Sequence, residues 1–261
     1  MTIQSNPEAK TDGLSGAYVQ LPEESAIRLL KDRYGMTGAL KRFDTEKDDT
    51  FRVTTEDGRR FILKVANPDE PFTEIDFQNS LLRYVETRDP TLPVPRIIDT
   101  EDGVDIFQIK DVDGSQRCVR LLTFLEGTPL DETQSDKTGR VQIGKMLARL
   151  RYATEGFTHE AEDRYYGWDV QHLLTLEHLL DEVDDYTQRQ ALSQGLERFR
   201  HIEVKLRQCR KHVLHNDFSK SNIIVDQNNP AYVTGIIDFG DAVKTAVAVD
   251  VATALLNQLP E

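Results

Sequence analysis

The sequence has little of what marks membrane-spanning or disulfide-stabilised proteins. It contains no run of about eighteen apolar residues, the length that a membrane-spanning helix needs. It has only two cysteines, Cys118 and Cys209, and their separation fits neither a metal site nor a disulfide framework. The first fifteen residues are polar and lack the apolar stretch of a secretory signal. We therefore expect reduced thiols in a cytoplasmic protein.

Positive charge is also scarce. Lys and Arg number 32 against 45 Asp and Glu, which gives a formal net charge of −13. Nucleic acids and anionic membranes carry charge of the same sign, so neither is expected as a partner. The excess of acid suits a cationic substrate if some of it lines the site, and surface solubility explains it equally well.

The sequence does contain enough apolar residues to form a core, and its polar motifs lie close together in one part of the chain. With 261 residues, 38% of them apolar, the chain can form one large domain or two lobes. The segment 215–222 reads H-x-D-x-x-x-x-N, and D-F-G follows at 238–240. This pair of segments is typical of the kinase-like phosphotransfer site.

The spacing assigns a role to each motif residue. Asp217 is predicted to accept the proton of an attacking hydroxyl, while Asn222 and Asp238 hold the Mg²⁺ that bridges the nucleotide phosphates. Apolar runs at 223–225 and 233–237 predict a hairpin that directs Asp238 back towards Asn222. His215 is interpreted as a scaffold residue that hydrogen-bonds the loop backbone.

The first half of the chain predicts an antiparallel sheet. Residues 1–20 read as a flexible leader, and a helix follows to about residue 35. Strand-like runs occupy 39–43, 50–55 and 59–65, and the last two are joined by a turn. Lys64 lies in the third run, where kinases place the lysine that holds the α and β phosphates. The turn 43–50 should fold over the phosphates, but it has no glycine, so backbone amides and small side chains must serve there.

The partner of Lys64 is open at this point. Kinases pair this lysine with a glutamate on the next helix, which is expected at 72–86. Gln78 stands where that acid is expected, and a neutral amide offers only a weaker hydrogen bond. Glu74 or Asp76 could substitute after a shift of one turn.

The second half of the chain predicts a hinge and then a helical region. Strands are expected around 96–98, 104–109 and 117–122, and they lead into residues 123–127. The backbone at Thr123 and Leu125 could hydrogen-bond the base of the nucleotide. An ordinary strand-to-helix linker fits the same residues. We thus expect a nucleotide-binding lobe at 21–122, a hinge at 123–127 and a catalytic lobe at 128–261. A helix is predicted at 133–154, with a buried stripe of Val141, Ile143, Gly144, Leu147 and Leu150. Two further helices are predicted around 167–169 and at 192–209, where Trp168 and Asp169 are pocket candidates. A last helix is predicted at 243–256, with Asp250 anchoring the catalytic loop.

The segment 213–241, together with Leu63-Lys64 and the Leu-Pro-Val-Pro segment at 92–95, resembles the aminoglycoside phosphotransferase and choline kinase superfamily. It is most similar to the hydroxylysine kinase branch. The resemblance implies an α+β, two-lobed protein-kinase-like fold, with a small antiparallel sheet lobe and a mainly helical C-terminal lobe. It also implies ATP or GTP with Mg²⁺, and the phosphorylation of a small-molecule hydroxyl.

Two departures from the family pattern are visible. Gln78 stands where many members carry Glu, although the hydroxylysine branch also has Gln there. Members usually continue past residue 261, so truncation at the C-terminus, or fusion to further domains beyond that residue, is expected.

Three functions follow from these patterns. The leading one is a kinase for an amino-containing alcohol such as hydroxylysine, homoserine, ethanolamine or an aminoglycoside. A protein kinase is disfavoured because no A-P-E segment follows the D-F-G. The non-enzyme alternative is a regulatory, nucleotide-binding kinase-like domain of a larger protein.

Overall fold

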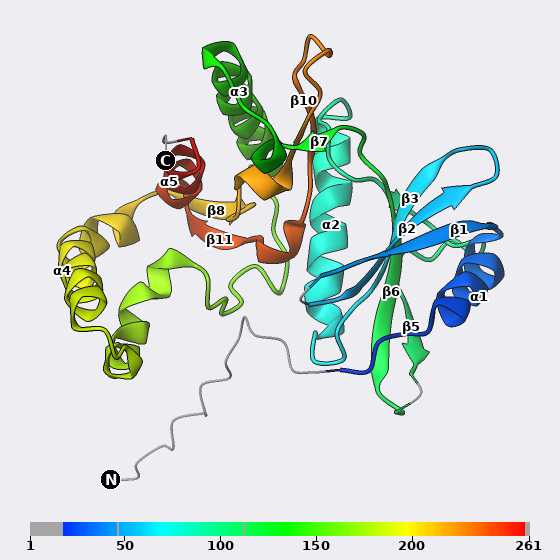
Figure 1. Ribbon diagram of the computed structural model, residues 1–261, viewed down its shortest axis with the longest axis horizontal. Helices are drawn as coiled ribbons and strands as arrows, with labels where there is room; N and C mark the ends of the chain where they lie inside the picture. The colour runs from blue at the N-terminus through cyan, green and yellow to red at the C-terminus, as the bar shows by residue number, and fades with distance from the viewer. Residues whose placement is uncertain (1–17, 46, 112, 259–261) are drawn as a thin grey trace.

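A computed structural model describes residues 18–45, 47–111 and 113–258. The N-terminal part is built on a sheet and the C-terminal part is mainly helical, as Figure 1 shows. The elements of the first part are α1 (Glu23–Tyr34), β1 (Gly38–Phe43), β2 (Asp49–Thr55), β3 (Arg60–Val65), α2 (Phe72–Arg88), β4 (Ile97–Ile98), β5 (Phe107–Lys110) and β6 (Gln116–Thr123). Those of the second part are β7 (Thr128–Pro129), η1 (Leu130–Glu132), α3 (Lys137–Thr154), η2 (Val170–Glu182), α4 (Tyr186–Gln208), β8 (Lys211–Leu214), η3 (Lys220–Asn222), β9 (Ile223–Val225), β10 (Val233–Ile236), η4 (Phe239–Asp241), β11 (Val243–Ala246) and α5 (Val247–Leu256).

The six-stranded sheet is antiparallel and runs in the order β1-β2-β3-β6-β4, with β5 also paired to β6. Side chains of β3 alternate between its two faces. Phe61, Leu63 and Val65 are buried in the core that α1 covers. Ile62 packs instead into the core formed by α2 and the C-terminal elements. Lys64 follows the same alternation as Ile62 and therefore faces α2.

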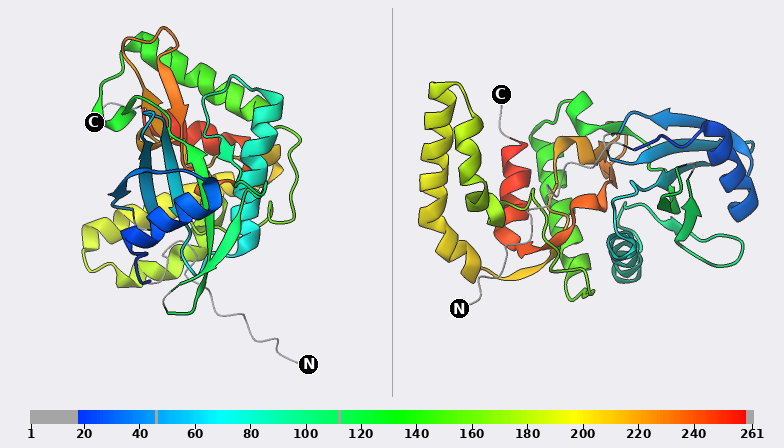
Figure 2. Two further views of the ribbon diagram at one scale, coloured as in Figure 1. Left: turned by 90° about the vertical axis from the view of Figure 1, so that its right-hand side faces the viewer. Right: turned by 90° about the horizontal axis from the view of Figure 1, so that it is seen from below.

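Helix α2 connects the two parts of the molecule. It lies between the sheet and the C-terminal elements in Figures 1 and 2, and it packs on α3. Phe77, Leu81 and Val85 are fully buried in one core together with residues of α3 and the β9–β10 hairpin. This shared core sets the distance between the strand that carries Lys64 and the loops that follow β8 and β10.

The C-terminal part differs from the expectation in three places. Residues 243–246, expected as helix, form β11 and pair with β8 because Val243 and Thr245 suit a strand, so α5 begins only at Val247. On α3, Ile143 and Leu150 are buried as expected, but Val141 is exposed. Gly144 is exposed too. The helix expected near residue 170 is the 3₁₀ segment η2, none of whose residues is buried.

Other expectations are met or fall outside the described chain. Both cysteines are free, with Cys118 buried and Cys209 exposed. The predicted leader lies mostly in residues 1–17, outside the described residues. Of its last three residues, Tyr18 packs under the guanidinium of Arg117. Within the described chain, no helix is long and apolar enough to cross a membrane.

A buried arginine joins the strands of the sheet. The Arg117 side chain is 0% exposed and lies 2.8 Å from a carboxylate oxygen of Asp49 and 2.8 Å from one of Asp111. It also donates to the carbonyls of Val65 and Ala66. One guanidinium therefore holds the start of β2, the end of β3 and the start of β6 together.

We expect Arg117→Met to lower the free energy of unfolding by about 3 kcal/mol or more, because it removes the buried cation that pairs with two buried carboxylates. Urea denaturation followed by circular dichroism measures this loss. Arg59→Met is the matched control, because Arg59 pairs with Asp57 at the exposed surface and such pairs contribute about 0–1 kcal/mol. Equal losses in the two variants would contradict the interpretation.

Candidate active site

The loop between β8 and β9 brings two of the predicted site residues into direct contact. The side-chain amide nitrogen of Asn222 donates to Asp217 Oδ2 at 2.7 Å and to the Asp217 carbonyl at 3.1 Å. This contact turns the amide nitrogen inward and fixes one oxygen of the carboxylate. The amide oxygen of Asn222 and the second oxygen of Asp217 accept no hydrogen bond from the described residues. Both are therefore available to a ligand.

His215 holds this loop to the segment after β10. Its Nδ1 accepts from the Asp217 backbone N–H at 3.3 Å, so its Nε2 carries the proton and donates to the Ile237 carbonyl at 2.9 Å. The ring is 1% exposed and lies edge-on to Phe239, with 4.8 Å between ring centroids. These contacts agree with the interpretation of His215 as a scaffold residue.

Asp250 of α5 anchors the same loop from the other side. Its carboxylate accepts from the Asn216 backbone N–H at 3.0 Å, and the residue is 3% exposed. This is the contact expected from the sequence. Burial raises the pKa of Asp250 above its usual value, and the hydrogen bond from Asn216 offsets only part of this effect.

Asp238 follows β10 and reaches towards the loop of Asp217. Its backbone has φ = 60°, in the left-handed region, and its carboxylate accepts from the Gly240 N–H at 3.2 Å. Asn216 also has a positive φ, of 67°. Non-glycine residues in this region cost about 1–3 kcal/mol each, and such strain is concentrated at functional sites. Of the three described non-glycine residues with positive φ, Asp238 belongs to the group formed with Asp217 and Asn222, Asn216 directly precedes Asp217, and Tyr232 lies in the β9–β10 turn.

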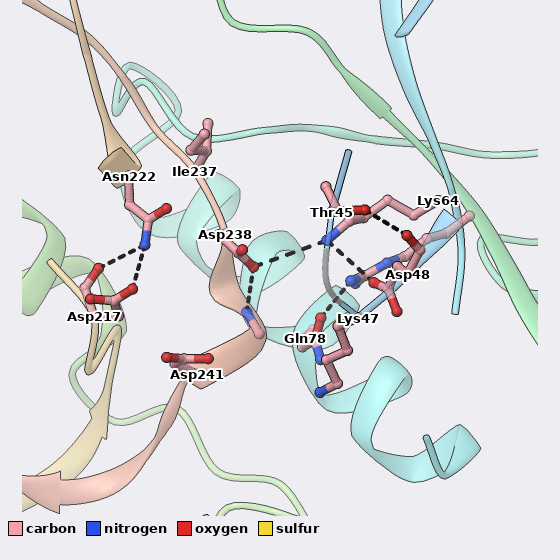
Figure 3. A network of polar contacts seen from close by, with 12 residues as sticks. Thr45, Lys47, Asp48, Lys64, Gln78, Asp217, Asn222, Ile237, Asp238 and Asp241 are labelled. Atoms are coloured by element: carbon pink, nitrogen blue, oxygen red, sulfur yellow. Dashed lines mark hydrogen bonds and ion pairs between the residues drawn. The ribbon is translucent and has the colours of Figure 1, made fainter. Parts of the chain in front are cut away.

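Lys64 extends from the sheet to this group, as Figure 3 shows. Its ammonium lies 3.4 Å from Asp48 Oδ2 and 4.0 Å from Asp238 Oδ1. Burial lowers the pKa of Lys64, but the carboxylates of Asp238 and Asp48 offset this effect and the pKa lies above its usual value. The same ion pair holds the pKa of Asp238 below its usual range. The structure thus places Lys64 and the C-terminal motif residues in one site.

Gln78 makes no hydrogen bond to Lys64, so the structure does not support it among the partners left open for the lysine. Its side-chain oxygen accepts from Arg120, and its nitrogen donates to Glu70 at 3.2 Å. The two possible substitutes are also engaged elsewhere. Glu74 pairs with Arg164, and Asp76 lies 3.0 Å from His159 Nε2.

The carboxylate beside Lys64 comes from a residue that the sequence did not single out. Asp48 lies at the end of the turn that was expected over the phosphates. That turn contains several acids close together, so no pattern distinguishes Asp48 from Asp44 or Asp49. Only the pairing of β2 with β3, in which Asp49 lies opposite Val65, brings Asp48 beside Lys64.

The predicted base contacts at the hinge are only partly compatible with the structure. The Thr123 backbone N–H is already donated to the Arg96 carbonyl at 2.9 Å, so it is not available to a base, and the prediction for this donor is wrong. Leu125 is half-buried, and its side chain lies against Gly235. The prediction of a backbone N–H donor to the base therefore rests on Leu125.

The two pocket candidates near residue 168 occupy different environments. Trp168 is 65% exposed and points away from the core. Asp169 is buried, caps η2 through the Gln171 N–H and accepts from Thr245, which is a structural role. A residue closer to the site, Asp241, accepts a hydrogen bond from the Tyr166 hydroxyl. Burial raises the pKa of Asp241. Asp241 was missed, although it directly follows the D-F-G motif.

The donor set fits a magnesium ion that also binds phosphate. The available oxygens are the amide oxygen of Asn222 and the carboxylate of the half-exposed Asp238, and both are hard ligands. Among the described residues, no group of three or more His, Cys, Asp or Glu could hold a metal ion alone. The ion would therefore need ligands from a nucleotide, as Mg²⁺ commonly has at such sites.

Comparison with known proteins identifies a family for this chain. The model of the phosphotransferase enzyme family matches residues 40–261. Hydroxylysine kinase of Mus musculus is 25% identical over 262 residues, which cover 92% of this chain and 69% of the relative. Across four curated hydroxylysine kinases, the chain spans 60–69% of their length.

Solved structures share the fold. An amicoumacin kinase in complex with AMP-PNP, Ca²⁺ and Ami aligns with a TM-score of 0.69 and 18% identity, covering 92% of this chain and 72% of that one. A microcompartment-associated aminopropanol kinase aligns with a TM-score of 0.63 and 20% identity, covering 90% of this chain and 74% of that one. The two-lobed α+β kinase-like fold expected from the sequence is confirmed.

We expect Asp250→Ala to release the backbone of the Asp217 loop. Loss of one hydrogen bond of about 1 kcal/mol should speed amide exchange at Asn216 by about fivefold. Hydrogen–deuterium exchange read by NMR measures this rate. Asp250→Asn keeps the acceptor oxygen and should keep the slow exchange, so faster exchange in both variants would count against the anchor.

The raised pKa of Asp250 implies that the free energy of unfolding depends on pH. Because the folded-state pKa of Asp250 is raised, its charged form costs stability, and this cost develops as the pH rises from about 4 through the raised pKa. Asp250→Asn removes the titrating group. Its free energy of unfolding relative to wild type should therefore increase between about pH 4 and pH 7, as measured by urea denaturation. A constant difference across this range would contradict the assignment.

Proposed function

The chain belongs to the phosphotransferase enzyme family, and from this premise we propose that it transfers the γ-phosphoryl group of ATP or GTP to a hydroxyl of an amino-containing small molecule. The observation that supports this most directly is the convergence of Asp217, Asn222, Asp238 and Lys64 on one site. These groups come from two loops and one distant strand. Their types match the base, metal and phosphate positions of kinase-like enzymes.

Each residue has a defined part in the proposed reaction. The oxygen of the acceptor hydroxyl forms a bond to the γ-phosphorus, the bond from that phosphorus to the β–γ bridging oxygen breaks, and the nucleoside diphosphate leaves. The hydroxyl proton passes to the unoccupied oxygen of Asp217, while Asn222 holds the other oxygen in place. Lys64 binds oxygens of the donor phosphates as a fixed cation. Asn222 and Asp238 would hold Mg²⁺, which neutralises phosphate charge when bound.

The nature of the acceptor is argued from charge and from relatives. The curated relatives are hydroxylysine kinases, and one structural neighbour is an aminopropanol kinase, so both names describe an alcohol that also carries an amine. In this chain Asp241 adds a third carboxylate close to Asp217 and Asp238, which raise its pKa in addition to the effect of burial. A site with several carboxylates attracts a cationic amine and disfavours a second anionic substrate.

We expect Asp217→Asn to lower kcat by about 10²–10⁴-fold and to leave nucleotide binding within about twofold, because the residue takes the proton and does not touch the donor. A screen of amino alcohols with ATP and with GTP, read by mass spectrometry of the phosphorylated product, identifies the acceptor. The same assay then compares the variants.

Asp226→Asn is the matched control for that experiment, because Asp226 lies in the turn of the β9–β10 hairpin and only bonds the backbone of that turn. Wild-type turnover in Asp217→Asn would refute the assignment of the base. Nucleotide binding without turnover of any acceptor would favour the regulatory domain over the enzyme.

We expect Asp238→Asn to raise the Mg²⁺ concentration needed for half-maximal nucleotide binding by about tenfold or more, because a charged ligand is replaced by a neutral one. Calorimetric titration with nucleotide at a series of Mg²⁺ concentrations measures the change. Asp57→Asn, in the exposed turn between β2 and β3, serves as the control. An unchanged Mg²⁺ requirement in Asp238→Asn would remove this residue from the metal site.

A further inference from the structure

Two cations lie side by side on the face of the sheet that points to α2. Lys64 of β3 is directly opposite Arg120 of β6 in the strand register. Like charges directly opposite each other destabilise an antiparallel pair. Arg120 is 5% exposed and bonds only to the side-chain amides of Gln78 and Asn79 among the described residues, so no carboxylate is bonded to it. Acidic neighbours of Lys64 are therefore needed to keep it charged and in place.

Helix α2 does not supply such an acid. Gln78, at the position where kinases carry a glutamate, is neutral, 2% exposed and engaged at both ends by Arg120 and Glu70. Glu70 itself pairs with Lys47 at 3.0 Å. The Gln78 side chain thus bonds to Arg120, and the partner of Lys64 comes from another element.

Asp48 has the geometry of a partner that is fixed before any ligand binds. Its side chain is 9% exposed and lies 3.4 Å from Lys64 Nζ through Oδ2. Its Oδ1 accepts from the Asn67 backbone N–H at 3.1 Å, and its own carbonyl accepts from Thr45 at 2.6 Å. The next residue, Asp49, is bound to the buried Arg117. The backbone of Asp48 and one oxygen of its carboxylate are therefore held by the frame of the sheet, independently of Lys64, and the other oxygen faces the lysine.

We propose that Asp48 is the positioning residue that holds Lys64 for the donor phosphates, in place of the helix-borne glutamate of protein kinases. The inference rests on the proposed function. Asp238, the other acid beside Lys64, is more distant at 4.0 Å and belongs to the proposed metal site. Once that carboxylate binds metal, Asp48 remains to align the ammonium.

Positioning of Lys64 by Asp48 and a mere charge effect of Asp48 predict opposite changes in nucleotide binding. If Asp48 acted only as negative charge near the phosphates, its removal would reduce repulsion and tighten nucleotide binding. If it aligns Lys64, its removal weakens binding, and the effect depends on Lys64 being present. A double-mutant cycle on Asp48 and Lys64 measures this dependence.

The first measurement uses no nucleotide. Urea denaturation compares wild type, Asp48→Asn, Lys64→Met and the double variant, because Asn keeps the oxygen that accepts from the Asn67 N–H. Asp48→Asn should lower the urea midpoint clearly in the wild-type background and by less than half as much in the Lys64→Met background. Asp44→Asn, an exposed acid in the same turn, should leave the midpoint unchanged.

Equal midpoint shifts in the two backgrounds would overturn the pairing. If Asp48→Asn alone fails to fold but the double variant folds, the two residues are coupled and the pairing stands. If neither Asp48→Asn nor the double variant folds, Asp48 stabilises the fold without Lys64, and the pairing is overturned.

The second measurement adds Mg²⁺ with AMP-PNP and, in parallel, with GMP-PNP. Asp48→Asn should weaken binding of the preferred analogue about tenfold in calorimetry, and it should have no further effect in the Lys64→Met background. Asp57→Asn, in the exposed turn between β2 and β3, should bind within about twofold of wild type. Unchanged or tighter binding in Asp48→Asn would overturn the positioning role.

A wild-type protein that binds neither analogue would refute the proposed function and, with it, the role of Asp48 towards the phosphates. The urea cycle would still decide whether Asp48 and Lys64 form a pair, so the two failures are distinguishable.

Discussion

The buried imidazole of His215 is the contact on which the geometry of the site depends. One ring nitrogen accepts from the backbone of Asp217 and the other donates to the carbonyl of Ile237, one residue before Asp238. A neutral imidazole has one donor and one acceptor, so both contacts can be satisfied only in a single tautomer. The spacing between the proposed base and the proposed metal ligand is thus set by a side chain that need not touch a substrate.

The backbone around this ring is held in an unfavourable conformation. Asn216 and Asp238 both have positive φ, and each lies beside a residue that His215 binds. The Asp250 carboxylate on the Asn216 N–H and the packing of Phe239 against the ring stabilise this conformation. The core that α2 shares with α3 and the β9–β10 hairpin also supports the loops that carry Asn216 and Asp238. Strain at the site is therefore offset by burial around it.

The parts of the site that are close in sequence could be predicted, and the parts that meet only through the sheet could not. The contact between Asp217 and Asn222 arises within one short loop, and the hairpin that presents Asp238 follows from two apolar runs and a turn. The partner of Lys64 depends instead on the register of β2 against β3 and of β3 against β6. No pattern in a single sequence gives that register, so the partner of Lys64 stays open among Gln78, Glu74 and Asp76 when only the sequence is known.

The fold shows the same division. Elements with strong local signals, such as α1 and the strands up to Val65, lie within one residue of their expected bounds. Residues 243–246 were expected as helix because an apolar run of that length is ambiguous between helix and buried strand. Pairing with β8 decides the matter in favour of a strand. That pairing in turn places Asp241, just before β11, within reach of Tyr166.

Charge compensation across the sheet connects these observations. Strands β3 and β6 carry two buried arginines, Arg117 and Arg120, and the partly buried Lys64, and the three are compensated in different ways. Arg117 receives two buried carboxylates, which makes it a structural cation. Arg120 receives only amides, and Lys64 receives the fixed Asp48 and the half-exposed Asp238. Of the three, only Lys64 has a half-exposed acidic neighbour, Asp238, that it can exchange for a phosphate without leaving a buried carboxylate unpaired. A lysine that binds the phosphate donor requires this property.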